Sequence, residues 1–478
     1  MSTVPDLSIA TLGPARIDSP LSAMLDAWRT TEHYVNEHDR VLLDDTLSMA
    51  TARGTSIADL PSLEPCGPRR KLFFDPSKTR AGIVTCGGLC PGLNDVIRGL
   101  VRSLTHHYGV RRVTGFRNGY QGFVASYAHG IVELTPEFVS DISNEGGTVL
   151  GTSRGHQDPQ EIVDCLERLN INVLFVVGGD GSMRGAMQIA QVAAERELRI
   201  SVVGIPKTID NDIPYIDQSF GFQTAFSRAA ESIRAVNVEA KSTPNGVGLV
   251  KLMGRHSGFI ASYAALANHD ADVVLIPEVP FGLEGEDGLL EYVRRRVRDR
   301  GHAVVVVAEG AGQELLPVAA ADKRPGHAGG NPGGNPGTDA SGNTTLRDIG
   351  PYLRERIIEA LTAAGTAPSV RYIDPSYAIR SVPANAYDKA YCLRLSNHAV
   401  HAAMSGRTAM VVGRLRRRFV HIPMALAVSR RNQVDPHGDL WMSVLEATGQ
   451  PMRFGPEPTL AAPPVAPRTR RNRVAAAG

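Results

Sequence analysis

The sequence has little of several features that define whole classes of protein. Its 478 residues include five cysteines without a Cys-x-x-Cys pair, which excludes a disulfide scaffold and favours reduced, structural thiols. The 51 basic and 49 acidic side chains nearly balance, so nothing indicates a nucleic-acid or membrane-surface partner. The sequence also lacks a secretory signal and any apolar run of about 18 residues. We therefore expect a cytoplasmic protein with small-molecule partners.

What the sequence does contain is a pair of apolar runs that each end in a polar loop. Residues 173–177 lead into Gly-Gly-Asp-Gly-Ser at 178–182, and a helical pattern follows from Met183. Residues 200–205 lead into Pro206 and then Lys-Thr-Ile-Asp-Asn-Asp at 207–212. Because open α/β sheets bind ligands at the carboxyl edge of parallel strands, we predict an active site there.

The residue types in these two loops suit phosphate and a divalent cation. The glycines of 178–182 let backbone N–H groups approach an anion, and a helix N-terminus adds positive potential. Asp180 would repel phosphate unless a cation such as Mg²⁺ lay between them. Asp210 and Asp212 would point to the same side of an extended chain, so one could take a proton from an alcohol while the other orients or binds metal. The first loop alone is equally compatible with an ordinary polar turn, and the second loop makes that plain interpretation weak.

Three motifs together resemble the 6-phosphofructokinase family. They are the loop 178–182, Pro-Lys-Thr-Ile-Asp-Asn-Asp at 206–212 and Lys-Leu-Met-Gly-Arg-His-Ser-Gly at 251–258, in the family's order and spacing. The resemblance covers about residues 75–450 and is nearest to the long-chain, ATP-dependent branch. It implies an α/β fold of two Rossmann-like, three-layer α/β/α lobes with largely parallel sheets.

The resemblance and the Pro- and Gly-rich stretches of the chain together predict two lobes with appended segments. Residues 323–340 are rich in Pro, Gly and Asn and cannot bury apolar surface, so we expect a flexible insertion there. The complete division is an N-terminal extension (1–74), a nucleotide-binding lobe (75–220 with 381–440), a sugar-phosphate-binding lobe (221–380 with 441–455) and a disordered tail (456–478).

The function that the resemblance implies is transfer of the γ-phosphoryl group of ATP to the 1-hydroxyl of fructose 6-phosphate, with Mg²⁺ as cofactor. Asp210 would be the catalytic base and Asp180 the magnesium ligand. The expected ATP-binding residues are Gly87, Arg154, Gly155, Gly179, Asp180, Gly181 and Ser182. The expected sugar-phosphate-binding residues are Thr208, Ile209, Asp210, Met253, Gly254, Arg255, Glu309, Tyr377 and Arg380. The family also implies a homodimer or homotetramer.

Taken singly, several of these residues have plainer interpretations. Met253 is typical of core packing, Glu309 of a helix cap, and Tyr377 with Arg380 of a surface pair. The glycine loop at 87–92 is typical of a structural strand-to-helix turn, and only the resemblance places it at the nucleotide phosphates.

Two residues bear on the phosphoryl donor. Family members that use pyrophosphate carry an aspartate after Gly-Gly-Asp, where its carboxylate blocks an α-phosphate, together with a lysine before Thr-Ile-Asp. This chain has Gly181 at the first position and Lys207 at the second. Because glycine leaves room for a nucleotide, we expect ATP; Lys207 keeps a pyrophosphate-dependent fructose 6-phosphate 1-phosphotransferase as the alternative. A further alternative, a non-catalytic nucleotide or sugar-phosphate sensor, is disfavoured by the presence of both Asp180 and Asp210.

Overall fold

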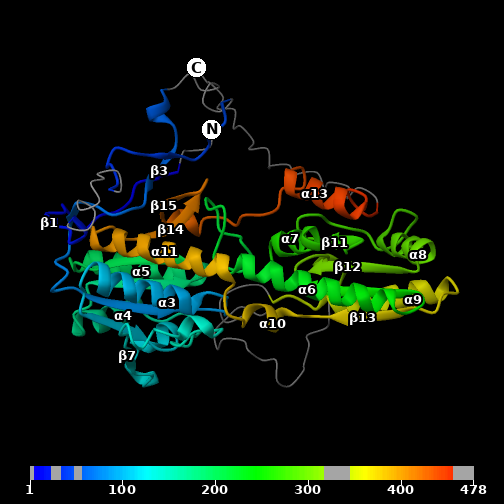
Figure 1. The fold of residues 1–478 in the computed structure, drawn as a ribbon, viewed down its shortest axis with the longest axis horizontal. Coiled ribbons are helices and arrows are strands. Elements are labelled where there is room, and N and C mark those ends of the chain that lie inside the picture. Colours follow the sequence, from blue (N-terminus) through cyan, green and yellow to red (C-terminus); the bar gives the residue numbers. More distant parts are fainter. Residues whose placement is uncertain (1–4, 23–33, 48–55, 317–344, 456–478) are drawn as a thin grey trace, which may run out of the picture.

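The computed structural model describes residues 5–22, 34–47, 56–316 and 345–455. Within them the chain forms two α/β lobes that lie side by side, a larger one around a nine-stranded sheet and a smaller one around a four-stranded sheet (Figure 1). The predicted fold class is confirmed. The predicted flexible insertion and the predicted disordered tail lie outside the described residues.

The larger sheet has five adjacent parallel strands at its centre, extended by antiparallel strands on both sides. The residues of β8 and β9 are buried throughout, which is why both segments are continuous apolar runs in the sequence. In spatial order the strands are β2 (Val41–Leu42), β3 (Ser62–Pro65), β15 (Arg418–Pro423), β14 (Met410–Leu415), β9 (Ser201–Pro206), β8 (Val173–Gly178), β5 (Arg80–Thr85), β6 (Arg112–Phe116) and β7 (Ile131–Glu133).

Helices cover both faces of this sheet and bury a separate apolar cluster against each. One face carries α3 (Leu93–Arg102) and α11 (Ala386–Met404). The other carries α4 (Pro159–Arg168), α5 (Asp180–Glu195) and the short α12 (Met424–Ala427). The lobe thus has the predicted three layers.

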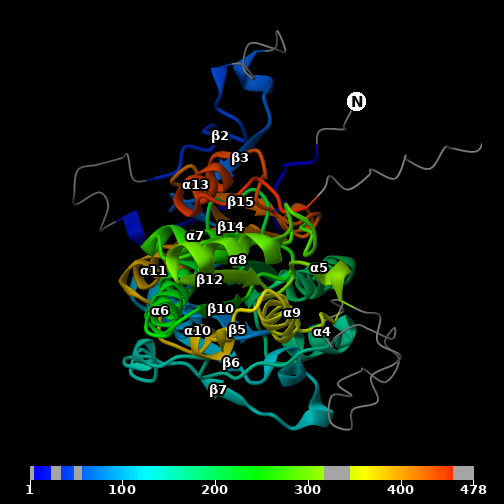
Figure 2. The same cartoon turned by 90° about the vertical axis from the view of Figure 1, so that its right-hand side faces the viewer.

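The smaller lobe repeats this arrangement around four parallel strands. Figure 2 views it end-on, and in both views α7 lies between α13 and β12. The strand order is β11 (Val273–Leu275), β12 (His302–Ala308), β10 (Gly246–Leu252) and β13 (Ser369–Ile373). One face is covered by α6 (Phe222–Lys241), α7 (Phe259–Asn268) and α13 (Asp439–Thr448), the other by α8 (Leu289–Arg300) and α9 (Ile349–Ala363), and α10 (Ser376–Arg380) follows β13.

Short elements complete the described fold. A two-stranded antiparallel ribbon pairs β1 (Ile17–Asp18) with β4 (Lys71–Leu72). The helical turns are η1 (Ile57–Asp59), the π-helical η2 (Ser103–His107), η3 (Gly119–Phe123), η4 (Ala125–Tyr127), η5 (Ile142–Asn144) and η6 (Gln313–Leu315).

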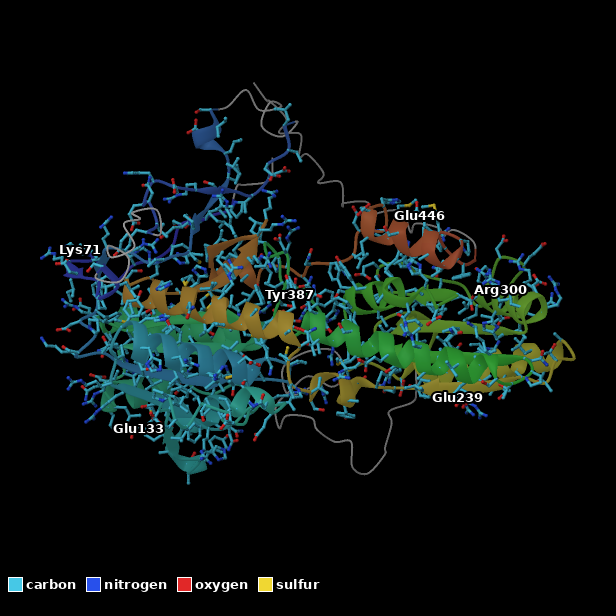
Figure 3. The ribbon with its side chains drawn as sticks, in the orientation of Figure 1. Lys71, Glu133, Glu239, Arg300, Tyr387 and Glu446 are labelled. Carbon is cyan, nitrogen blue, oxygen red and sulfur yellow. The ribbon has the colours of Figure 1, made fainter. Side chains whose placement is uncertain are left out.

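The lobes are joined where α6 and α11 begin. The backbone N–H and the hydroxyl of Thr224, at the start of α6, donate to Oδ2 of the buried Asp388 on α11 at 2.7 and 2.6 Å. Figure 3 places Tyr387 at this junction, where its hydroxyl donates to Gln218 and accepts a hydrogen bond from Arg414. Buried polar contacts of this kind fix the angle between two helices more tightly than apolar packing alone.

The predicted strands and helix around the first two motifs are present, with small shifts at their ends. Strand 173–177 is β8, one residue longer, and strand 200–205 is β9, displaced by one residue. The helix after the first strand begins at Asp180 instead of Met183. Asp180, Gly181 and Ser182 therefore form the first helical turn, which brings the helix N-terminus closer to the sheet edge than the sequence pattern indicated.

The thiols behave as the sequence analysis predicted. All five cysteines are free, and four of them are buried. Burial raises the pKa of the Cys86 and Cys90 thiols to about 12, so both stay protonated at neutral pH. None of the helices in the described part of the chain is long and apolar enough to cross a membrane.

A buried ion network fastens the N-terminal extension to the larger sheet. Glu64 on β3 accepts hydrogen bonds from Arg407 at 2.7 and 3.0 Å and from Arg69, and Glu37 pairs with both arginines at 2.8 and 2.9 Å. Burial opposes ionisation of Glu64, but contacts with His421, Arg407 and Arg69 lower its pKa to about 2. Burial also opposes the charged form of His421 and lowers its pKa. The two guanidinium groups therefore supply the positive charge at neutral pH.

We expect Glu64→Gln to destabilise the protein by about 3 kcal/mol, because it removes the buried carboxylate that both guanidinium groups share and leaves them the more exposed Glu37. A carboxylate whose pKa is depressed in the folded state stabilises the fold above its unfolded pKa, and this stabilisation is lost as the pH falls toward 2. The variant should therefore lose less stability than the wild type between about pH 5 and pH 2. Urea unfolding across this range measures both effects.

The matched control is Asp18→Asn, whose exposed carboxylate pairs with Lys71 at the surface. Its loss of stability should stay below about 1 kcal/mol. Equal losses in the two variants would contradict a structural role for the buried network.

Candidate active site

Three adjacent strands of the larger sheet deliver their loops to one cleft. β5, β8 and β9 are parallel neighbours, so the loops 87–92, 178–182 and 207–212 all leave the sheet at its carboxyl edge. Together with Arg255 and His256 of the smaller lobe, residues of these loops line a cleft of about 570 Å³. The cleft therefore lies at the end of β8 and β9, the edge for which the sequence analysis predicts an active site, and Arg255 and His256 from the second lobe also line it.

Glycine is required at two points of these loops. Gly87 has a φ of +82°, which side chains disfavour. A Cβ on Gly178 would lie 2.4 Å from the side chain of Ser182, so only glycine lets β8 end this close to the first turn of α5. The N-cap of that helix, Gly179, has no side chain to accept from the first N–H groups. These donors are thus available to an anion in the cleft.

The loop 207–212 is held in shape by its own polar contacts. Thr208 Oγ1 donates to Asp212 Oδ1 at 2.7 Å and accepts from the backbone N–H of Asp210 at 3.2 Å. Asn211 has a φ of +57°, a conformation that asparagine tolerates better than most residues, and its Oδ1 accepts from the Ser219 N–H at 2.7 Å. This fixed turn leaves Asp210 in the lining of the cleft.

Asp210 has a strongly perturbed carboxylate. Its Oδ1 is shielded from solvent and has no hydrogen-bond partner among the described residues. Burial, with the negative charges of Asp212 and Glu309, raises the pKa of Asp210 to about 8, and a backbone hydrogen bond and the charge of Arg255 oppose this rise. A carboxylate that has one unpartnered oxygen and a pKa near neutral is typical of a general base.

All seven residues predicted to bind ATP line the cleft: Gly87, Arg154, Gly155, Gly179, Asp180, Gly181 and Ser182. The donor-specificity residue Lys207 lines it too, and burial lowers the pKa of its ammonium group. Cβ atoms on Gly87 and Gly88 would lie 3.8 Å from Lys207 Nζ and 3.6 Å from Arg154 Nη2. The glycine loop therefore runs beside two cationic groups, which suits a phosphate chain.

The residues predicted to bind the sugar phosphate fall into two groups. Thr208, Asp210 and Arg255 line the cleft, and Arg380 lines an adjoining cavity of about 270 Å³ beside the glycine loop. Burial raises the pKa of Glu309, while the charges of Arg255 and Arg380 act against this rise, so these three side chains are electrostatic neighbours. This group forms a polar region to which both lobes contribute.

The other predicted sugar-phosphate residues lie elsewhere. Met253 is 8% exposed and packs in the apolar core of the smaller lobe, and Ile209 packs against the cores of both lobes. Gly254, with a φ of +134°, forms the turn before Arg255. Tyr377 is 77% exposed, with Arg380 Cζ 4.5 Å from the centre of its ring. Direct contact with a substrate stays a prediction for these four residues and for those that line the cleft.

The cleft also contains residues that the sequence analysis did not select. Arg431 is the most consequential, because Nη2 lies 3.0 Å from Asp180 Oδ2 and Nη1 lies 2.5 Å from Asp212 Oδ2. It comes from a part of the chain 219 residues beyond Asp212, so no local motif could have indicated it. The other unselected lining residues include Tyr120, His156, Gln157, Arg184, Gln188 and His256.

Comparisons with known proteins agree with this geometry. Residues 80–403 match the sequence model of the Phosphofructokinase family. An ATP-dependent 6-phosphofructokinase of Amycolatopsis methanolica is 60% identical over 450 residues, which cover 94% of this chain and 96% of that protein. One of Borreliella burgdorferi is 44% identical, covering 94% of this chain and 97% of the relative.

Solved structures share the fold. A pyrophosphate-dependent phosphofructokinase from Marinobacter aquaeolei aligns with a TM-score of 0.62 at 21% identity, covering 80% of this chain and 94% of that one. The phosphofructokinase of Saccharomyces cerevisiae aligns with a TM-score of 0.57 at 24% identity, covering 77% and 47%. Fold, site and sequence lead to one conclusion: the chain belongs to the phosphofructokinase family.

Proposed function

We propose that this protein is an ATP-dependent 6-phosphofructokinase. It transfers the γ-phosphoryl group of ATP to the 1-hydroxyl of fructose 6-phosphate and yields fructose 1,6-bisphosphate and ADP. The near full-length similarity to relatives that carry this name supports the activity. The structural observation that carries the proposal is Asp210, which has an unpartnered oxygen and lines the cleft together with the glycine loops of the larger lobe and Arg255 of the smaller one.

In this mechanism Asp210 takes the proton of the 1-hydroxyl as the hydroxyl oxygen attacks the γ-phosphorus. The bond between the γ-phosphorus and the bridging oxygen breaks, and ADP leaves with that oxygen. Phosphoryl transfer depends mostly on alignment and on electrostatic stabilisation of the transferring group. Arg154 and Lys207, beside the glycine loop, supply positive charge on the donor side. Arg255, Glu309 and Arg380 orient the sugar phosphate.

The donor set fits Mg²⁺. Across the described residues there is no group of three or more His, Cys, Asp or Glu side chains placed to hold a metal ion. Mg²⁺ beside a nucleotide needs no such group, because one or two carboxylates suffice when phosphate and water oxygens complete the octahedron. Asp180, in the cleft at the N-terminus of α5, would be the protein ligand. The bound ion would supply charge neutralisation for the phosphates.

The oligomeric state rests on the family resemblance alone, and the location rests on the sequence analysis. A homodimer or homotetramer and a cytoplasmic location stay predictions. Neither affects the assignment of Asp210, Asp180 or the glycine loop.

The deciding experiment is an initial-rate assay with fructose 6-phosphate and Mg²⁺, with either ATP or pyrophosphate supplied to the same purified protein. We expect turnover with ATP. Because only ionised Asp210 accepts a proton, kcat/KM for the sugar phosphate should rise with pH up to about 8. Turnover with pyrophosphate alone would mean that Lys207 outweighs Gly181, and no turnover with either donor would favour a sensor.

We expect Asp210→Asn to reduce kcat by about 10²-fold or more, since it removes the base. The same variant should unfold at a higher temperature at pH 8. A carboxyl whose pKa is raised in the folded state stabilises the fold below its unfolded value, and this stabilisation is lost as the pH rises through about 8. The asparagine variant escapes that loss, so its thermal advantage should grow from about pH 4 to pH 8.

The control for this variant is Asp217→Asn, an exposed carboxylate in the same connecting segment. Differential scanning calorimetry and rate assays on both variants measure the two effects. Near-normal turnover in Asp210→Asn, or an equal thermal gain in the control, would overturn the assignment of the base.

We expect Gly181→Asp to lower kcat/KM for ATP by at least about tenfold, because a carboxylate at this exposed position repels the nucleotide phosphates. Gly181→Asn has nearly the same size without the charge and is the matched control. If both variants lose ATP use equally, charge at this position does not select the donor.

A further inference from the structure

The segment between α12 and α13 passes from the larger lobe to the smaller one beside the cleft. The backbone N–H of Asn432 donates to the carbonyl oxygen of Asp212 at 2.7 Å. The next side chain, Gln433, donates through Nε2 to the carbonyl oxygen of His256 at 3.0 Å. The segment is thus fastened to a loop of each lobe, and these contacts hold the backbone of Arg431 at the cleft.

Arg431 forms ion pairs with carboxylates on two different loops. Nη2 lies 3.0 Å from Asp180 at the start of α5, and Nη1 lies 2.5 Å from Asp212 in the loop after β9. The second oxygen of Asp212 accepts from the Thr208 hydroxyl, and its side chain is only 5% exposed. One guanidinium group therefore supplies the positive charge between two carboxylates that the fold brings together.

Three carboxylates share this side of the cleft. Asp180, Asp210 and Asp212 all line it, and Arg431 forms ion pairs with Asp180 and Asp212. Because like charges in a partly buried region repel one another, a guanidinium group between two of them lowers the cost of holding them together.

We propose that Arg431 is a positioning residue that occupies the place of a divalent cation beside Asp180 while no nucleotide is bound. Its guanidinium holds the carboxylates of Asp180 and Asp212 in place, and it repels a second cation from Asp180. The nucleotide phosphates bring the negative charge that lets Asp180 bind Mg²⁺ beside Arg431. The role of the nucleotide in this inference rests on the proposed function, whereas the competition at Asp180 does not.

The test is a titration with Mn²⁺ in the absence of nucleotide, followed by the electron paramagnetic resonance signal of the free ion. Arg431→Gln should bind Mn²⁺ at least about tenfold more tightly than the wild type, because the competing charge is gone. Arg431→Lys keeps the charge but cannot contact both carboxylates as a fork, so its affinity should lie between the two.

The matched control is Arg430→Gln. This change removes the same charge one residue away. The Cζ atom of Arg430, however, lies over the ring of Tyr215, 5.2 Å from the ring centre. Its Mn²⁺ affinity should equal that of the wild type. Turnover at saturating Mg²⁺ and ATP should fall in Arg431→Gln and recover in part in Arg431→Lys, while Arg430→Gln stays near the wild-type rate.

Equal Mn²⁺ affinities in the wild type and Arg431→Gln would overturn the proposal, as would weaker binding by the variant. If Arg431→Gln does not fold, a wild-type affinity in Arg431→Lys would overturn it instead. Failure of the wild type to use ATP would refute the proposed function and leave this result standing, because the titration contains no nucleotide.

Discussion

The parallel pairing of β5, β8 and β9 is the constraint on which the site depends. Each strand ends at the same edge, so three loops with different tasks meet although they lie far apart in the sequence. A shift of one residue in either pairing would turn the buried side chains of β8 toward the wrong layer, and the two apolar clusters on the faces of the sheet prevent this. The position of Asp180 relative to Asp210 is therefore set by the core of the larger lobe, and loops need only supply chemistry.

The cleft combines groups that would be unstable in isolation. Carboxylates with raised pKa values lie near arginines and near a buried lysine whose pKa is lowered. The negative charges are tolerated because the positive charges are close, and the positive charges are tolerated for the same reason. A site of this kind is costly for the fold but prepared for a highly charged substrate, because the protein dipoles and charges need little rearrangement when phosphate arrives. The smaller lobe contributes Arg255, and Ser257 in the same turn donates through its hydroxyl to the carbonyl oxygen of Asp210 at 3.0 Å.

Much of this arrangement could be predicted from the sequence, and the limits have physical causes. Apolar runs ending in glycine or proline located β8 and β9 to within one residue, and the spacing of the motifs located Asp180 and Asp210. The start of α5 was predicted three residues too late. Residues 180–182 have a composition typical of a loop, although they form the first helical turn. Arg431 escaped notice since its partners are set by tertiary packing over more than 200 residues of chain. The packing of Met253 and the exposure of Tyr377 likewise depend on neighbours that no local pattern specifies.

The attachment of the N-terminal extension has a consequence for how the protein is made. β3 pairs with β15, and Glu64 binds Arg407, which lies 343 residues later. During synthesis the first strands therefore leave the ribosome long before their partners exist. Until nearly the whole polypeptide has been translated, the edge of β3 stays unpaired. The Glu64 carboxylate, which is largely buried in the folded protein, stays in solvent for the same time. Completion of the larger sheet is thus a late event, and truncated chains that stop before β14 lack the surface that would hold their own beginning.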